Sequence, residues 1–312
     1  MRAMYEVVIR TSVPILFLIG AGLLSRRIGV LKSGDERVLS AYLYYFALPA
    51  FFFVNIAEAD FSQETLVLMA AGILPILIAL AALTLLYVTL RFSRDRFFLL
   101  TLSTVFGSLA FFGIPFVTLA YPGVGERLAA LTSAFIALFS VTLSLSLLEI
   151  YKLEGFTKTD GVKRVMARLS RNPLIISILA GIPFSLADVE IPSPVSNPLH
   201  MLGETTIVVA IFMLGVFLYG RRYTKLGDAF KLTLLRMVFL PTVAFLTVRL
   251  LGLGSIEGSV LVIMNGTPVA ISMIVLSDRY NFHREKIVSL VLVSSLTATI
   301  SLNLWVLLLQ YL

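Results

Sequence analysis

The chain has 312 residues, of which 58% are hydrophobic and 14% are charged, and its mean hydropathy is +0.96. Polar side chains are too few to cover a soluble globule of that size, which excludes a soluble enzyme or binding domain. The formal net charge is +7, but the charges lie between apolar stretches, so we expect a lipid bilayer and no nucleic acid as partner. The chain has no cysteine, so thiolate metal sites and disulfides are excluded, and we expect no cofactor.

Apolar stretches follow one another along the whole chain, and about 20 residues cross the hydrocarbon core as a helix. They predict an all-α membrane protein with ten transmembrane helices. The first stretch has no small-residue cleavage site, so we expect a retained helix and not a signal peptide. The predicted segments are 5–24, 38–56, 65–90, 98–121, 128–151, 172–187, 201–220, 231–251, 258–277 and 287–311.

Positive charges alternate from one connection to the next. The connections after the odd-numbered segments carry four, three, six, four and three Lys and Arg residues, whereas the other connections carry one, Arg127. Lys and Arg are enriched in cytoplasmic loops. The sequence therefore predicts a multi-pass cell-membrane protein with both termini on the extracellular or periplasmic side.

The longest cytoplasmic connection, 152–171, separates two runs of five segments, 1–151 and 172–312. Because five is odd, related halves would enter the membrane from opposite sides, as in the inverted repeats of many secondary transporters. Prolines at matching places in segments 3 and 8, Pro75 and Pro241, favour this arrangement. We expect two inverted five-helix repeats.

Segments 4 and 9 each contain a Gly-x-Pro sequence near the middle. Proline removes an amide donor, and glycine leaves helical dihedrals at little cost, so we expect both helices to break there and to cross near the midplane. Freed backbone cannot face lipid, and paired interruptions in two halves indicate a transport site that favours anions. The residues of the two sequences are Gly113, Ile114, Pro115, Gly266, Thr267 and Pro268.

Other polar side chains in the segments indicate a site less specifically than the two Gly-x-Pro sequences do. Asn265 is expected to line the crossing, although an interhelical hydrogen bond is the alternative for it, and Thr267 could cap a freed carbonyl. Asn55 and Glu204, near outer helix ends, are candidates for an outer vestibule. Arg236 lies about a turn and a half inside segment 8, and we expect its side chain to extend to the lipid headgroups.

At this point the chain resembles the auxin efflux carrier family, which includes the plant PIN carriers and many prokaryotic relatives. The resemblance rests on ten helices in two inverted fives, on the GIP of segment 4, and on DRYNFH after segment 9, where Tyr280, Asn281 and His283 match the family's Tyr-Asn-x-His. It covers the whole membrane domain, without the long cytoplasmic loop of many plant members.

The resemblance implies an elevator-type carrier, with segments 1, 2, 6 and 7 as scaffold and segments 3–5 and 8–10 as transport domain. The substrate's carboxylate would bind beside the crossing of segments 4 and 9. The family usually has Asn seven positions before the segment 4 proline, where this chain has Ser108. The shorter side chain argues against indole-3-acetate. The resemblance to members of the family outside plants implies small acids such as malate or malonate. A homodimer is compatible with the resemblance, but no interface is evident in the sequence.

Three alternatives remain open at this level. A sodium-coupled symporter of the bile-acid type is the nearest in mechanism, but no acidic residue lies at the centre of segments 3, 4, 8 or 9, which favours transport without ion coupling. An intramembrane enzyme is disfavoured because His200 and His283, the two histidines, are predicted in loops on opposite sides, and no H-E-x-x-H occurs. A receptor-like bundle is opposed by the paired helix breaks.

Overall fold

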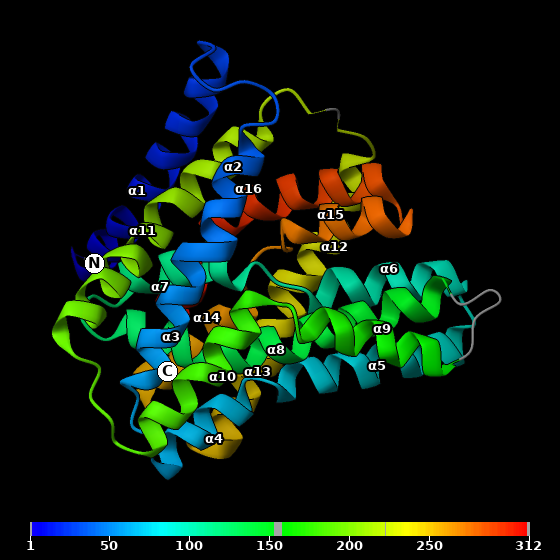
Figure 1. Ribbon diagram of the computed structural model, residues 1–312. Coiled ribbons are helices and arrows are strands. Elements are labelled where there is room, and N and C mark those ends of the chain that lie inside the picture. Colours follow the sequence, from blue (N-terminus) through cyan, green and yellow to red (C-terminus); the bar gives the residue numbers. More distant parts are fainter. Residues whose placement is uncertain (1, 153–157, 222, 311–312) are drawn as a thin grey trace.

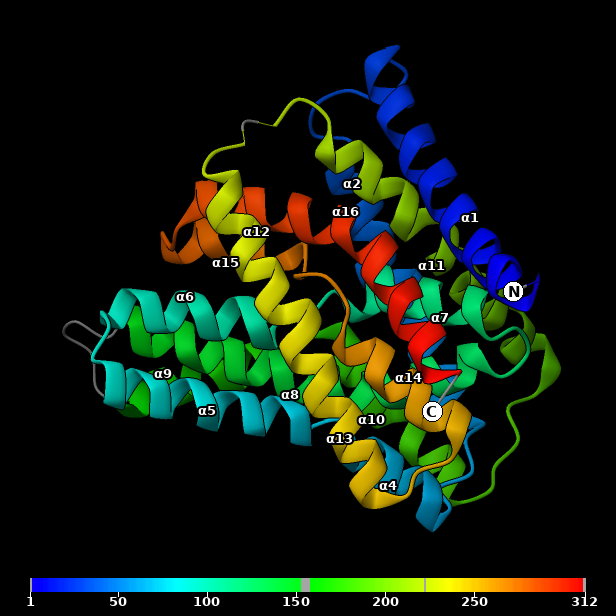
Figure 2. The same ribbon diagram turned by 180° about the vertical axis from the view of Figure 1, so that it is seen from behind.

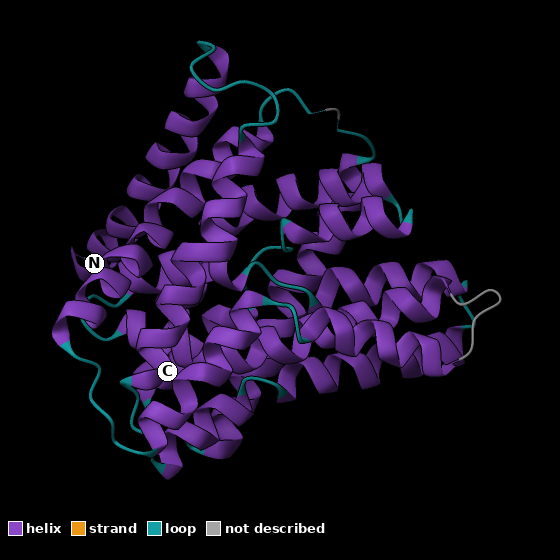
Figure 3. Ribbon diagram, viewed as in Figure 1, coloured by secondary structure: helices purple, strands orange, loops and turns teal. Residues whose placement is uncertain are grey.

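The structure is a computed structural model that describes residues 2–152, 158–221 and 223–310. Figures 1 and 3 show that the regular elements in these ranges are helices. Residues 153–157 of the predicted connection 152–171 lie outside the described residues, as do residues 1, 222, 311 and 312.

The helices of the first half follow the predicted segments closely, although several segments consist of two or three pieces. They are α1 (Arg2–Arg27), α2 (Glu36–Tyr42), η1 (Leu43–Ala47), α3 (Leu48–Ala57), α4 (Gln63–Ala71), α5 (Leu74–Leu90), α6 (Arg94–Val105), η2 (Leu109–Gly113), α7 (Ile114–Ala120) and α8 (Gly125–Lys152).

The second half begins with a helix in the connection and then follows the remaining segments. Its helices are α9 (Lys158–Leu169), α10 (Pro173–Leu186), α11 (Ser193–Leu218), α12 (Leu226–Leu234), η3 (Leu235–Phe239), α13 (Leu240–Leu251), α14 (Ser255–Asn265), α15 (Ser272–Tyr280) and α16 (Arg284–Leu309). Helix α9 was not predicted, because its apolar positions Val162, Val165, Met166 and Leu169 lie among basic residues and give no long apolar run.

Among the described residues, seven helices are long and apolar enough to cross a membrane, or eight when the bent pair Val162–Leu169 and Pro173–Leu186 is counted as one span. The pair bends by 64°. The shorter apolar helices Leu109–Ala120 and Ser255–Asn265 belong to the interrupted segments 4 and 9. These observations establish an all-helical, multi-pass membrane protein; the inverted repeat with ten spans goes further and belongs to the proposal below.

Within the described residues, three segments contain a π-helical turn, and each turn ends two residues before a proline: η1 before Pro49, η2 before Pro115 and η3 before Pro241. Proline has no amide hydrogen, and its ring clashes with the carbonyl of residue i−4 in an α-helix. A wider i→i+5 turn before the proline relieves this clash without ending the helix. These prolines therefore reshape the helices and do not break them.

The helices pack in two groups. Helices α1, α3, α10 and α11 pack mainly on one another, whereas α5, α6, α8, α9 and the helices from α12 to α16 form the second group. In Figures 1 and 2, α5, α6, α8 and α9 run side by side, across the direction of α1 and α11. Much of the outer surface is apolar; Leu250, for example, is 86% exposed. Such a surface suits acyl chains.

Candidate functional site

The break in segment 4 lies at Phe106–Ser108, between the end of α6 and the start of η2. The prediction that Gly113, Ile114 and Pro115 form this break was wrong in position. These three residues are buried in a continuous helix, because the η2 turn accommodates Pro115. The chain leaves the helix one to two turns earlier.

The break in segment 9 lies where the sequence predicted it. Helix α14 ends at Asn265, Gly266 is its C-cap, and helix α15 begins at Ser272. Thr267 and Pro268 are in the non-helical stretch between them and are fully enclosed by protein. The freed backbone therefore does not face lipid, as the physics of the bilayer requires.

The two breaks contact each other through their backbones. Gly107 and Val269 form an isolated antiparallel bridge. The Ser108 amide donates to the Pro268 carbonyl at 2.7 Å, and the Ala270 amide donates to the Phe106 carbonyl at 3.0 Å. Each break thus satisfies part of the backbone that the other has released, which fixes their relative position.

Most of the predicted site residues lie around this bridge. Ser108 is part of it, and Thr267 and Pro268 precede Val269 directly. A Cβ on Gly113 would lie 2.8 Å from Thr267 Cγ2, so the helix after the first break packs tightly on the second break. Gly266 faces Leu302 of α16, where an added Cβ would lie 3.1 Å from the Leu302 side chain.

Asn265 has one unpaired polar atom in the protein interior. Its side chain is 1% exposed, and its Nδ2 donates to the Leu261 carbonyl at 3.0 Å. Its Oδ1 is buried and has no hydrogen-bond partner among the described residues. A buried acceptor without a partner is costly, and it suits a hydroxyl or amide donor on a ligand.

Four helix ends converge at the bridge. Helices η2 and α15 begin there, and their first amides carry the positive end of each helix dipole. Helices α6 and α14 end there, and their last carbonyls carry the negative ends. The same small volume therefore offers one environment for an anion and another for a cation.

The negative ends are occupied by Arg236, a residue for which the sequence prediction was wrong. Its side chain lies in η3 and is 1% exposed, so it does not extend to the headgroups. It donates from Nη1 to the Thr104 carbonyl, from Nε to the Thr267 carbonyl, and from Nη2 to Thr267 Oγ1. The only signal in the sequence is the charge itself inside an apolar segment, which by default indicates function.

Gly107 makes room for this guanidinium. A Cβ at this position would lie 1.9 Å from Arg236 Nη2 and 2.7 Å from Thr267 Oγ1. No side chain fits in that space, so glycine is required by the close approach. Among the described residues, no carboxylate pairs with Arg236, and the ion pairs of the structure involve other groups. The site therefore carries a buried positive charge without an acidic partner.

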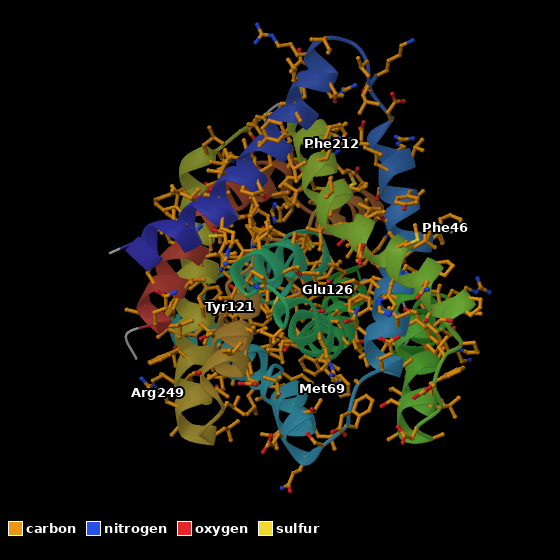
Figure 4. The ribbon with its side chains drawn as sticks, turned by 90° about the vertical axis from the view of Figure 1, so that its left-hand side faces the viewer. Phe46, Met69, Tyr121, Glu126, Phe212 and Arg249 are labelled. Carbon is orange, nitrogen blue, oxygen red and sulfur yellow. The ribbon has the colours of Figure 1, made fainter. Side chains whose placement is uncertain are left out.

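The two vestibule candidates lie near a third residue that the sequence analysis did not single out. Asn55 is buried and donates to the Phe51 carbonyl at 3.0 Å, whereas Glu204 is exposed on α11. Glu126, at the start of α8, lies close to Asn55 and interacts electrostatically with Glu204 and His200. Figure 4 shows Glu126 near the middle of the face that has α1 and α11 in front.

The DRYNFH stretch, Asp278 to His283, spans the end of α15 and the connection to α16 in the second helix group. The Tyr280 hydroxyl donates at 2.6 Å to Glu149, which is 4% exposed and also pairs with Arg164 and Arg168 of α9. This buried carboxylate therefore links α8 to α9 and α15.

Asn281 and His283 adopt left-handed backbone conformations, and His283 Nε2 lies 2.8 Å from Asp95 Oδ2. Partial burial alone would raise the pKa of Asp95, but the hydrogen bond from Tyr151 and the contact with His283 hold it below its ordinary value. The stretch thus ties α15 and α16 to α6 and α8.

Comparison with known proteins identifies the family of the chain. The profile of a family described as "Membrane transport protein" (Mem_trans) matches residues 7–306, nearly the whole chain. The chain belongs to this family, the auxin efflux carrier family. An uncharacterized transporter of Methanocaldococcus jannaschii is 24% identical over 302 residues, which cover 93% of this chain and 95% of that protein.

Membership in the auxin efflux carrier family confirms the resemblance seen in the sequence and makes the protein a transporter and not an enzyme. Both histidines are also committed elsewhere: His200 Nε2 lies 2.9 Å from Glu58, and His283 contacts Asp95. A Ser-His pair inside the bilayer is therefore not available in the described structure.

Proposed function

We propose that this auxin efflux carrier family member is a secondary transporter that exports or exchanges small organic anions by an elevator-type movement. The observation that carries the proposal is the contact of two helix breaks, where two helix starts and one buried guanidinium meet without an acidic partner. A carboxylate would supply the missing negative charge and accept from the free amides at the helix starts.

The proposal includes ten spans in two inverted five-helix repeats, 1–151 and 172–312. Segment 4 is the fourth segment of the first half, segment 9 is the fourth segment of the second half, and both are interrupted. The two breaks pair in antiparallel orientation, as expected for an inverted repeat. Pro75 and Pro241 likewise lie at the second position of α5 and α13, near the middle of segments 3 and 8. The alternation of Lys and Arg supports termini on the outer side.

The packing of the helices supports an elevator movement. The four helices α1, α3, α10 and α11 hold together by contacts among themselves, and they correspond to segments 1, 2, 6 and 7. The breaks lie in the other group, where α14 packs on α8 and α16. In an elevator, this second group carries the site past the first, so the site remains intact while its access changes.

The polar groups at the breaks favour a small acid that also has a hydroxyl or amide donor. Ser108 is shorter than the Asn usual in the family and leaves less reach toward a large ligand. The unpaired Asn265 Oδ1 can accept from a donor on the substrate. Malate-like acids combine both features in a small molecule. Malonate lacks the donor, and auxin-like acids carry their indole N–H on a larger ring system. Membrane potential favours anion exit by about 2.3 kcal/mol per charge at 100 mV.

Counterflow in proteoliposomes tests the proposal. Purified protein should exchange radiolabelled malate or malonate against an internal pool of the same acid, and Asn265→Ala and Pro268→Ala should reduce this exchange strongly. Asn197→Ala, at an exposed position of α11, is the matched control and should exchange normally. Absence of exchange for malate, malonate and indole-3-acetate would contradict the proposal, and exchange that requires a sodium gradient would favour the symporter.

A further inference from the structure

The carbonyls that bind Arg236 are those that the helix breaks leave without donors. In a continuous helix, the Thr104 carbonyl would accept from the Ser108 amide, but that amide donates to Pro268 across the bridge. The Thr267 carbonyl would likewise accept from Ile271, which lies outside regular helix at the cap of α15. Both released carbonyls accept from the guanidinium of Arg236.

Oxygen atoms of this kind form cation sites in other transporters. Carbonyls of unwound segments and the C-terminal ends of half-helices coordinate Na⁺ where interrupted helices meet. Here the Thr104 carbonyl, the Thr267 carbonyl and Thr267 Oγ1 converge on one position, and this position contains the guanidinium. Gly107 provides the space that the planar group needs.

We infer that Arg236 is a tethered cation that takes the place of a coupling sodium ion at the crossing, so that this carrier works without sodium. The inference rests on the proposed function and deepens it, since it names the source of the positive charge and the coupling behaviour. Arg236 acts as a positioning residue, because its donors hold the carbonyls of both breaks and leave the helix starts for the substrate.

A covalently attached cation and a bound sodium ion differ in whether transport is coupled to the sodium gradient. Sodium must bind from solution at each cycle, which links transport to the sodium gradient. The guanidinium of Arg236 moves with the site, is always charged, and is enclosed at 1% exposure, so sodium has no vacant oxygen cage to enter. Removal of the side chain would open that cage and restore a site for a free cation.

Thermal unfolding of the purified protein without any substrate tests this inference. We expect the unfolding midpoint of the wild type to be the same in sodium chloride and in choline chloride of equal ionic strength. Arg236→Ala should unfold at a lower temperature, and sodium or a low, non-denaturing concentration of guanidinium should raise its midpoint, because each cation would bind the emptied oxygen cage. Choline is too large to do so.

Three further variants make the result decisive. Arg249→Ala removes the same charge from an exposed position on α13 and should show no sodium response. Arg236→Lys keeps a charge near the carbonyls and should stay insensitive to sodium, whereas Arg236→Gln, which keeps the volume without the charge, should respond as Arg236→Ala does. If neither neutral variant folds, sodium stabilisation of the wild type or of Arg236→Lys would still overturn the inference.

Sodium stabilisation of the wild type, or of Arg236→Lys, would overturn the inference. So would a folded Arg236→Ala or Arg236→Gln that responds neither to sodium nor to guanidinium. Insensitivity of both charged forms, together with a response of the neutral forms, supports it. Because no substrate is present, the unfolding midpoints do not depend on malate exchange. They would still test the role of Arg236 if the protein exchanged no organic anion.

Discussion

At the scale of single residues, the site depends on a close fit between Gly107, Thr267 and the guanidinium of Arg236. The buried charge is tolerated because carbonyl oxygens surround it, and it would be costly if any side chain displaced it. Asn265 was expected at the crossing as one of the few strongly polar side chains at mid-depth, and Ser108 was expected there from the resemblance to the family. In the structure Asn265 ends α14, and the Ser108 amide donates across the bridge. The direction of the Arg236 side chain was not predictable, because one sequence does not say which face of segment 8 points into the protein.

Gly107→Ala tests this fit directly. The added methyl group would overlap Arg236 Nη2, so we expect the guanidinium to lose at least one carbonyl and the free energy of unfolding to fall by about 3 kcal/mol or more. Gly227→Ala, in α12, is the control, because a Cβ there meets nothing within 4 Å. Equal unfolding midpoints for the two variants would show that Gly107 is not needed for the placement of Arg236.

At the scale of elements, hydrophobic length predicted the long helices within a few residues: segment 128–151 is α8, Gly125–Lys152. The prediction failed where local backbone chemistry decides. The π-turn before Pro115 moved the break of segment 4 toward α6, and α9 was missed because its apolar face is short. Composition determines where helices cross the membrane, but it does not determine how a helix adapts to a proline.

The contact between α1 and α11 gives a prediction about close helix packing. A Cβ on Gly22 would lie 2.2 Å from the Phe212 carbonyl oxygen, so Gly22→Ala should force the two helices apart and destabilise the protein by about 1 to 3 kcal/mol. Gly20→Ala, two positions earlier in α1, meets open space and should be neutral or stabilising by ~0.5 kcal/mol. Thermal unfolding of the three proteins in one detergent compares them, and a stable Gly22→Ala would contradict the packing.

The docking of α9 on α8 gives a second prediction at this scale. Glu149→Gln keeps an acceptor for Tyr280 but removes the charge that pairs with Arg164 and Arg168, so α9 should be held less firmly, by about 1 to 2 kcal/mol. Hydrogen exchange of the α9 amides should become faster. Glu190→Gln, at an exposed position outside the helices, is the control. Unchanged exchange in Glu149→Gln would mean that apolar contacts alone hold α9.

At the scale of the whole molecule, the resemblance to the family implies a scaffold and a transport domain, and this division remains a proposal. The structure shows that α1, α3, α10 and α11 pack mainly on one another. Sequence reasoning from repeats could reach the pairing of segments 4 and 9, because interrupted helices need protein around them. The contacts between the two helix groups could not be predicted from the sequence, because they differ between the two end states of the proposed elevator movement. One such contact joins α1 and α16, where Thr11 Oγ1 donates to Asn303 Oδ1 at 2.6 Å.

If the second group moves past the first, a covalent link between α1 and α16 should stop transport. The chain has no native cysteine, so Thr11→Cys with Asn303→Cys introduces a unique pair. We expect its oxidation, or a short dithiol crosslinker, to abolish anion exchange, and reduction of the disulfide to restore it. The control pair, Ile56→Cys with Gly181→Cys, joins α3 and α10 within the first group, where an added Cβ at Gly181 would lie 3.1 Å from Ile56 Cβ. That link should leave exchange intact, because helices that stay together during the movement lose nothing when they are tied. Full exchange by the crosslinked Thr11→Cys, Asn303→Cys protein would rule out an elevator movement between these groups, whatever the substrate proves to be.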